Sequence, residues 1–269
     1  LEFRRVLFRS AANMMYGATT SMLMKIFDPM GVETTQVDPC DFAAFEKALN
    51  ETKPGCVIVE TIANPLLRVP ALDRIAQACR AADVPLIVDN TFATPLLVRP
   101  LELGANIVCH SVTKYLAGHG DVLGGIIVAD AANFDTIRTL SRTMGPVLGP
   151  FESYLTMRGI KTLGLRFERQ CANANQVAAW LTKHPSVERV YSPSLPDHPD
   201  AEAIGRLFPA GKSSGLVAFE LKGADKPKIF RFMESLKMIV RATSLGDVHT
   251  MILYPAMASH RDLSPKHRE

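Results

Sequence analysis

The segment Pro85-Leu-Ile-Val-Asp89 is a short apolar run that ends in an aspartate, and runs like it recur along the first half of the chain. A strand that is apolar along its whole length must be buried on both faces, which is typical of sheets covered by helices on each side. The pattern predicts an α/β fold with a parallel or mixed sheet. The expected strands cover 56–60, 85–89, 106–110 and 124–129, and apolar residues at helical spacing predict a helix over 72–82.

The chain is predicted to divide into a large domain, linking helices and a smaller α+β domain. We expect its first ten residues, which are rich in arginine and unlike the rest of the chain, to be a non-native leader. One or two helices form the link, with Trp180 and Leu181 on an apolar stripe, and residues 192–200 form a proline-rich surface loop. The expected leader covers residues 1–10, the large domain 11–150, the linking helices 151–183 and the smaller domain 184–269.

Composition excludes several classes of function. The 269 residues carry 30 basic and 27 acidic side chains, a net charge of +3, so the charge gives no support to a nucleic-acid partner. No stretch approaches the ~18–20 consecutive apolar residues that a membrane span requires. The five cysteines and seven histidines show no metal-ligand spacing, so we expect no metal, and reduced thiols indicate a cytoplasmic protein.

The residues that carry chemistry follow two of the predicted strands. Asp89 ends one strand, and Ser111-Val-Thr-Lys114 follows another. A pyridoxal phosphate (PLP) enzyme needs such a pair, because a lysine forms a Schiff base with the aldehyde and an aspartate keeps the ring nitrogen protonated. Ser111 and Thr113 supply hydroxyls suited to the cofactor phosphate. Taken singly, a lysine such as Lys114 is in most cases an exposed surface charge. Asp89 alone is about equally typical of a partner for an arginine or a helix N-terminus and of a partner for the ring nitrogen.

Other candidates are weaker. The glycine-rich segment 118–125 lacks the Gly-Lys-Ser/Thr ending of a nucleotide-binding loop, and we expect His119 within it to be structural. Tyr16 is consistent with an ordinary core aromatic and with a residue that stacks on a pyridine ring and exchanges protons with a substrate.

With these residues taken together, the chain resembles the Cys/Met-metabolism family of fold-type I PLP enzymes. This transsulfuration family includes cystathionine γ-synthase, cystathionine γ-lyase, methionine γ-lyase and the O-acylhomoserine sulfhydrylases. The resemblance covers residues 11–269 and implies a mainly parallel, seven-stranded type of sheet. It rests on Tyr16-Gly17, Glu60-Thr-Ile-Ala-Asn64-Pro65, Val88-Asp-Asn-Thr91, Arg99-Pro-Leu-Glu-Leu-Gly-Ala105, Ser111-Val-Thr-Lys114-Tyr-Leu-Ala-Gly-His-Gly-Asp121, Arg158-Gly-Ile-Lys-Thr-Leu163 and Ser244-Leu-Gly-Asp247.

The resemblance implies a role for each matching residue. Lys114 binds the cofactor and moves protons on the substrate, and Asp89 pairs with the ring nitrogen. Tyr16 stacks on the ring and assists proton transfer. The remaining implied contacts are Ser111 and Thr113 to the phosphate, Asn64 to the ring hydroxyl and the substrate carboxylate, and Ser244 and Leu245 to the substrate.

The implied reaction is γ-elimination or γ-replacement on methionine, cystathionine or an O-acylhomoserine, in a homo-oligomer that is a dimer of dimers. The motifs do not separate a lyase from a synthase or sulfhydrylase, and a fold-type I aminotransferase or an inactive fragment remains an alternative. Thr243 and Ala18 depart from residues common in cystathionine-handling enzymes and in methionine γ-lyases, respectively. The resemblance also implies that both ends of the family pattern are missing, as in an internal fragment.

Overall fold

The computed structural model describes residues 8–10 and 15–257. Its main sheet has the strand order β2-β1-β3-β4-β5-β6, in which β6 alone runs antiparallel to its neighbour. The predicted α/β class is therefore confirmed, although the described residues supply six strands where seven were expected. The strands are β1 (Phe8–Ser10), β2 (Thr35–Val37), β3 (Val57–Glu60), β4 (Leu86–Asp89), β5 (Ile107–Ser111) and β6 (Gly125–Ala129).

Residues 8–10, which fall in the expected leader, form the short strand β1 between β2 and β3. The origin of residues 1–10 stays a prediction, and residues 1–7 and 11–14 lie outside the described residues.

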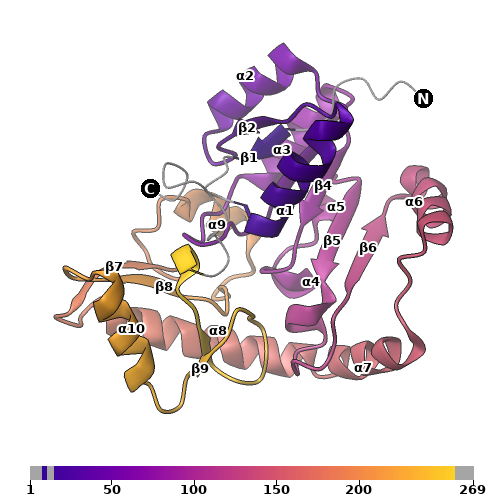
Figure 1. The fold of residues 1–269 in the computed structure, drawn as a ribbon. Helices are drawn as coiled ribbons and strands as arrows, with labels where there is room; N and C mark the ends of the chain where they lie inside the picture. The colour runs from indigo at the N-terminus through magenta and orange to yellow at the C-terminus, as the bar shows by residue number, and fades with distance from the viewer. Residues whose placement is uncertain (1–7, 11–14, 258–269) are drawn as a thin grey trace.

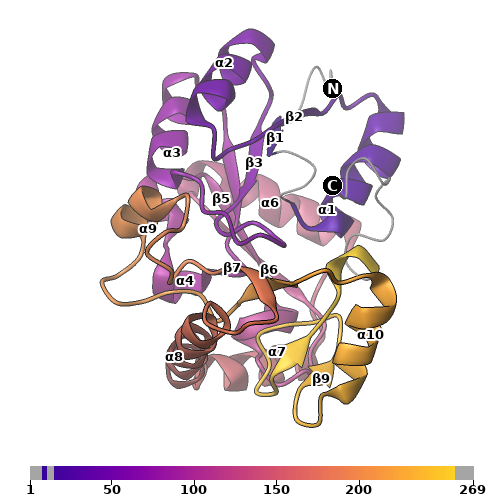
Figure 2. The same cartoon turned by 90° about the vertical axis from the view of Figure 1, so that its left-hand side faces the viewer.

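Helices lie on both sides of the sheet. Figures 1 and 2 show α2 and α3 over one face and α1 over the other, with α6 next to β6 at the edge. The helices of this part are α1 (Gly17–Met22), α2 (Phe42–Thr52), α3 (Leu72–Ala81), α4 (Thr94–Leu97), α5 (Pro100–Leu103) and α6 (Ala131–Met144).

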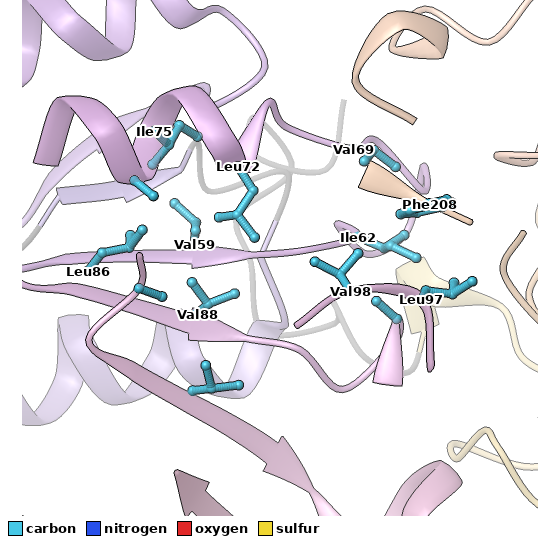
Figure 3. Packing of buried hydrophobic residues seen from close by; sticks show 14 of the residues in the cluster. Val59, Ile62, Val69, Leu72, Ile75, Leu86, Val88, Leu97, Val98 and Phe208 are labelled. Atoms are coloured by element: carbon cyan, nitrogen blue, oxygen red, sulfur yellow. The ribbon is translucent and has the colours of Figure 1, made fainter. Parts of the chain in front are cut away.

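The main core lies between the sheet and α2 and α3. Figure 3 shows Leu72 and Ile75 of α3 packed over Val59 of β3, with Leu86 and Val88 of β4 beside them. Each of these side chains is at most 1% exposed, so each stabilises the fold by about 1.5–3 kcal/mol relative to an exposed position. Because side chains alternate along a strand, Ile58, Glu60, Ile87 and Asp89 belong to the opposite face. There Ile58 packs with Leu23 beneath α1.

Two helices, α7 (Pro150–Ile160) and α8 (Leu163–Leu181), occupy most of the region 151–183, and the division of the chain into domains stays a prediction. Leu181 is buried but Trp180 is 61% exposed, so the expected stripe was wrong for Trp180. Adjacent helical residues point about 100° apart, and only one of the two can face the core.

The smaller part consists of short strands and helices, of which β7, β8, β9 and α10 lie in the lower half of Figure 1, whereas α9 lies higher and contacts α3. The predicted surface loop 192–200 is partly buried, because Ser192 and His198 are almost fully covered and Asp200 pairs with Arg68. The elements here are β7 (Val187–Tyr191), α9 (Ala201–Leu207), β8 (Ala218–Leu221), α10 (Lys226–Ser235), β9 (Val240–Arg241) and β10 (Met251–Ile252). Among the described residues, no helix has both the length and the apolar character needed to cross a membrane.

Candidate active site

Asp89 and Lys114 lie at the same edge of the sheet. Asp89 is the last residue of β4, and Lys114 follows the end of its parallel neighbour β5 by three residues. Parallel strands present their carboxyl ends at one edge, where open α/β sheets bind their ligands. The structure therefore brings together the two residues on which the predicted cofactor chemistry depends.

Lys114 lies in a π-helical turn, Val112–Leu116, whose backbone departs from helical geometry at the lysine itself (φ −91°, ψ −129°). The Lys114 Nζ donates a hydrogen bond to the Ser244 Oγ at 3.0 Å. Partial burial lowers the pKa of the Lys114 amine, because desolvation disfavours its charged form. A neutral amine is the nucleophile that Schiff-base chemistry requires.

Two neighbouring side chains of α8 contact the turn that carries Lys114. Arg166 of α8 donates hydrogen bonds to the carbonyl oxygens of Tyr115 (2.9 Å), Leu116 (3.4 Å) and Gly159 (2.8 Å). The buried Tyr115 ring packs edge-on against Phe167, with 5.1 Å between ring centroids. These contacts fix the base of the lysine side chain.

The segment 244–248 packs against the turn that carries Lys114. Val248 N–H donates to the Gly118 carbonyl at 3.1 Å, and Gly246 lies so close that an added Cβ would be 2.6 Å from the Tyr115 nitrogen. Gly246 also has φ of +78°, a conformation that favours glycine. Ser244 is thereby brought to Lys114 across 130 residues of sequence, and Leu245 packs against the core.

The Asp89 carboxylate accepts a hydrogen bond from the Thr91 N–H at 2.9 Å. Thr91 in turn ties β4 to β5, because its Oγ1 accepts from the Ser111 N–H at 2.9 Å. The Thr113 hydroxyl accepts from the Gly124 N–H (3.0 Å) and donates to the Gly124 carbonyl (3.4 Å). Ser111 is the last residue of β5, and Thr113 lies two residues beyond it.

Tyr16 and Asn64 belong to two further segments, the start of α1 and the loop after β3. Tyr16 directly precedes α1 and is 45% exposed as a residue, which is inconsistent with the core-aromatic interpretation. Asn64 lies in the loop after β3. Both residues donate their main-chain N–H to one carboxylate, that of Glu60, at 2.6 and 3.3 Å.

Glu60 was missed as a site residue, although it ends β3 as Asp89 ends β4, and the two are register partners. It is 6% exposed. Burial and the neighbouring Asp89 raise the pKa of Glu60 to about 8, against the opposing effect of its two N–H donors. The sequence signal was an acidic residue at the end of each of two neighbouring apolar runs.

The exposed His119 has its Nδ1 2.7 Å from the Ala117 carbonyl oxygen, and its structural role stays a prediction. Among the described residues, no group of His, Cys, Asp and Glu side chains is arranged to hold a metal ion. Two surface cavities, one beside β7 and one between α4 and α9, lie away from Lys114.

Comparison with known families decides the lineage. Residues 10–269 match the family described as Cys/Met metabolism PLP-dependent enzyme. The chain belongs to this family. Its predicted membership is therefore confirmed, and with it the cofactor of the family, PLP.

Members of the Cys/Met metabolism family with related sequences and structures include lyases. The chain is 39% identical to L-methionine gamma-lyase of Pseudomonas putida, with 95% of this chain and 64% of that protein covered. It superposes on cystathionine gamma-lyase from Lactobacillus plantarum complexed with L-serine at a TM-score of 0.92, with 35% identity, 98% of this chain and 68% of that one.

A third relative is a putative O-acetylhomoserine (thiol)-lyase from Campylobacter jejuni, with 26% identity and a TM-score of 0.90 over 98% of this chain and 70% of that one. That structure contains N'-pyridoxyl-lysine-5'-monophosphate. The present chain spans slightly less than two thirds of the length of the Pseudomonas enzyme.

The residues at the sheet edge fit PLP. A half-buried lysine with a lowered pKa bonds to a hydroxyl, and a carboxylate ends the adjacent strand. The donor set thus offers a nucleophilic amine for the aldehyde and an acid for the ring nitrogen.

Proposed function

We propose that this chain binds PLP through Lys114 and acts on the γ carbon of a sulfur-linked or O-acylated amino acid. The observation that carries the proposal is the Lys114 amine, whose pKa is lowered by burial, beside Ser244 at the edge where Asp89 ends β4. When bound, PLP supplies an electron sink that stabilises negative charge on substrate carbon atoms.

In this proposal, the remaining residues hold the cofactor and the substrate. Asp89 pairs with the ring nitrogen, Tyr16 stacks on the ring, and Ser111 and Thr113 bind the phosphate. Asn64, Ser244 and Leu245 contact the substrate. Support comes from the convergence of four separate segments at this edge of the sheet: the start of α1, the loop after β3, the turn after β5 and the segment 244–248.

Lys114 has two tasks in the proposed reaction. It would hold the cofactor, and it would move protons between Cα and Cβ of the substrate. A group that both accepts and returns protons works best with a pKa near the working pH, and burial moves Lys114 in that direction. Ser244 Oγ, at 3.0 Å, orients the amine.

The substrate class we propose is methionine, cystathionine or an O-acylhomoserine. As a lyase, the chain would break the bond from Cγ to sulfur and consume water, giving a thiol, a 2-keto acid and ammonia. As a synthase or sulfhydrylase, it would join the sulfur of an incoming thiol to Cγ as the bond from Cγ to oxygen breaks and the acyl group of an O-acylhomoserine leaves as a carboxylic acid. The names of the relatives include both outcomes, and Thr243 and Ala18 favour neither cystathionine nor methionine strongly.

The test is 2-keto acid release by the PLP-loaded chain with each of the three substrates, with and without an added thiol. Keto acid without thiol supports a lyase, and turnover only with thiol supports a synthase or sulfhydrylase. Transfer of the amino group to an added keto acid would favour the aminotransferase alternative. Absence of PLP absorbance in the purified chain with added PLP, with Lys114→Ala as the blank, would favour the inactive-fragment alternative.

We also propose that the protein is a cytoplasmic homo-oligomer. Support comes from the five free cysteines and from apolar side chains that are exposed on the outer side of β6, α6 and α7. Exposed apolar surface of this extent is typical of association sites.

A further inference from the structure

Glu60 is a buried carboxylate that the reaction as proposed does not use. It is 6% exposed, and no lysine or arginine of the described part of the chain forms an ion pair with it. A buried carboxylate without partners is costly, so its contacts must offset its desolvation. Those contacts are two main-chain N–H groups, one on each oxygen: Tyr16 N–H to Oε1 at 2.6 Å and Asn64 N–H to Oε2 at 3.3 Å.

The two donors belong to residues on opposite sides of Glu60 in the sequence. Tyr16 lies 44 residues before it and Asn64 four residues after it. Neither segment is part of the sheet: Tyr16 directly precedes α1, and Asn64 lies in the loop between β3 and α3. A single side chain at the end of a buried strand therefore connects the sheet to both segments.

Glu60 is also next to the residue expected to hold the ring nitrogen. It is the register partner of Asp89, which in turn is the partner of Cys109 on β5, so the three occupy one face of the sheet in a row. Burial together with the Asp89 carboxylate favours the protonated form of Glu60. Glu60 and Asp89 therefore lie side by side at the edge of the sheet where the cofactor is expected.

We propose that Glu60 is a positioning residue that fixes the main chain at Tyr16 and Asn64, so that their side chains meet the cofactor and the substrate at the Asp89–Lys114 edge. This inference rests on the proposed function. It assigns Glu60 no contact with the reacting atoms.

The test compares four variants of the full chain. Glu60→Gln keeps the size but leaves one acceptor oxygen for two N–H groups, and Glu60→Ala removes both acceptors. Glu60→Asp keeps the carboxylate on a shorter side chain and serves as the conservative variant. Glu220→Gln removes a carboxylate far from the site, where Glu220 bonds to the Tyr191 hydroxyl on the exposed side of β8, and is the matched control.

The first readout is amide hydrogen exchange at Tyr16 and Asn64 in the PLP-free chain. We expect exchange at both amides to increase about 10-fold or more in Glu60→Ala, the scale of leaving a buried N–H donor without its acceptor. Glu60→Gln should increase exchange at one of the two amides, Glu60→Asp should restore part of the protection, and Glu220→Gln should match the parent chain.

The second readout is the visible circular dichroism of bound PLP, which reports how the ring is held. We expect Glu60→Gln to reduce the signal per bound cofactor, and to have a smaller effect in a chain that already carries Tyr16→Ala. With substrate, kcat should fall roughly 10²-fold with a smaller change in KM, as expected for an ångström-scale displacement of site residues.

Unchanged exchange at Tyr16 and Asn64 in Glu60→Ala would overturn the inference. So would increased exchange spread evenly over the whole chain, because it would show a general loss of stability. Failure of the parent chain to bind PLP would defeat the proposed function instead, and the exchange data would still decide whether Glu60 fixes the two segments.

Discussion

The Lys114 amine is half-buried, and desolvation lowers its pKa. An exposed lysine titrates near 10.4, so Lys114 should be neutral at a lower pH than other lysines of the chain. We therefore expect the rate of PLP attachment to rise with pH and to level off below about pH 10.4. Stopped-flow absorbance across a pH series measures this midpoint, with Lys114→Ala giving the background from other lysines. A midpoint at the value of a lysine peptide would contradict the burial argument.

A second residue-scale prediction concerns the ion pair between Arg68 and Asp200. Two guanidinium nitrogens of Arg68 donate to the Asp200 carboxylate at 2.6 and 2.8 Å, and Asp200 also accepts from the Val69 N–H. Arg68→Ala would leave Asp200 buried without its cation, so we expect the free energy of unfolding to fall by about 3 kcal/mol. Urea denaturation measures the change.

The matched control for this pair is Arg99→Ala. Arg99 also bonds to a carboxylate, that of Glu102 at 3.2 Å, but both side chains are about two-thirds exposed. Its loss should cost roughly 0–1 kcal/mol. Equal effects of the two substitutions would show that the contact between the 61–70 loop and the 192–200 loop contributes little.

At the scale of elements, the segment 244–248 depends on close approach to the Lys114 turn. A Cβ at Gly246 would lie 2.6 Å from the Tyr115 nitrogen and 3.0 Å from the Lys114 carbonyl carbon. We expect Gly246→Ala to push Ser244 away from Lys114 and to weaken PLP binding, measured by titration of the visible absorbance. Gly223→Ala is the control, because Gly223 also has a positive φ (55°) but open space around it. Equal PLP affinity in the two variants would refute the packing argument.

Most elements near the site were predictable because apolar runs with clear boundaries encode them. The strands ending in Glu60 and Asp89 and the helix from Leu72 match the prediction within one residue. The direction of β6 could not be predicted, because its apolar run indicates a strand but carries no information on its antiparallel pairing.

Contacts between distant segments were the part that sequence could not supply. The hydrogen bond from Lys114 to Ser244 spans 130 residues, and that from Tyr16 to Glu60 spans 44. Residue type alone also left Tyr16 between core and site, whereas its exposure in the structure favours the site. The burial of His198 within a proline-rich stretch likewise depends on packing, since its Nε2 lies 3.2 Å from the Leu67 carbonyl oxygen.

At the scale of the whole molecule, α7 carries an exposed apolar stripe. Phe151, Tyr154 and Met157 recur every three residues on this helix and are all more than half exposed. We expect the chain to self-associate through this surface and the triple substitution of these residues by serine to shift the equilibrium toward monomer in sedimentation experiments. Lys161→Ser, at the end of the same helix, is the control. An unchanged oligomeric distribution in the triple variant would exclude this stripe as a contact surface.

The proposed chemistry depends above all on Lys114 holding PLP at the edge of the sheet where Asp89 ends β4. Reduction of the PLP-loaded chain with borohydride, followed by peptide mass mapping, locates the attached cofactor. We predict one pyridoxyl phosphate group on the peptide that contains Lys114 and none at that position in Lys114→Arg. Absence of the label, or equal labelling of many lysines in both chains, would contradict this assignment.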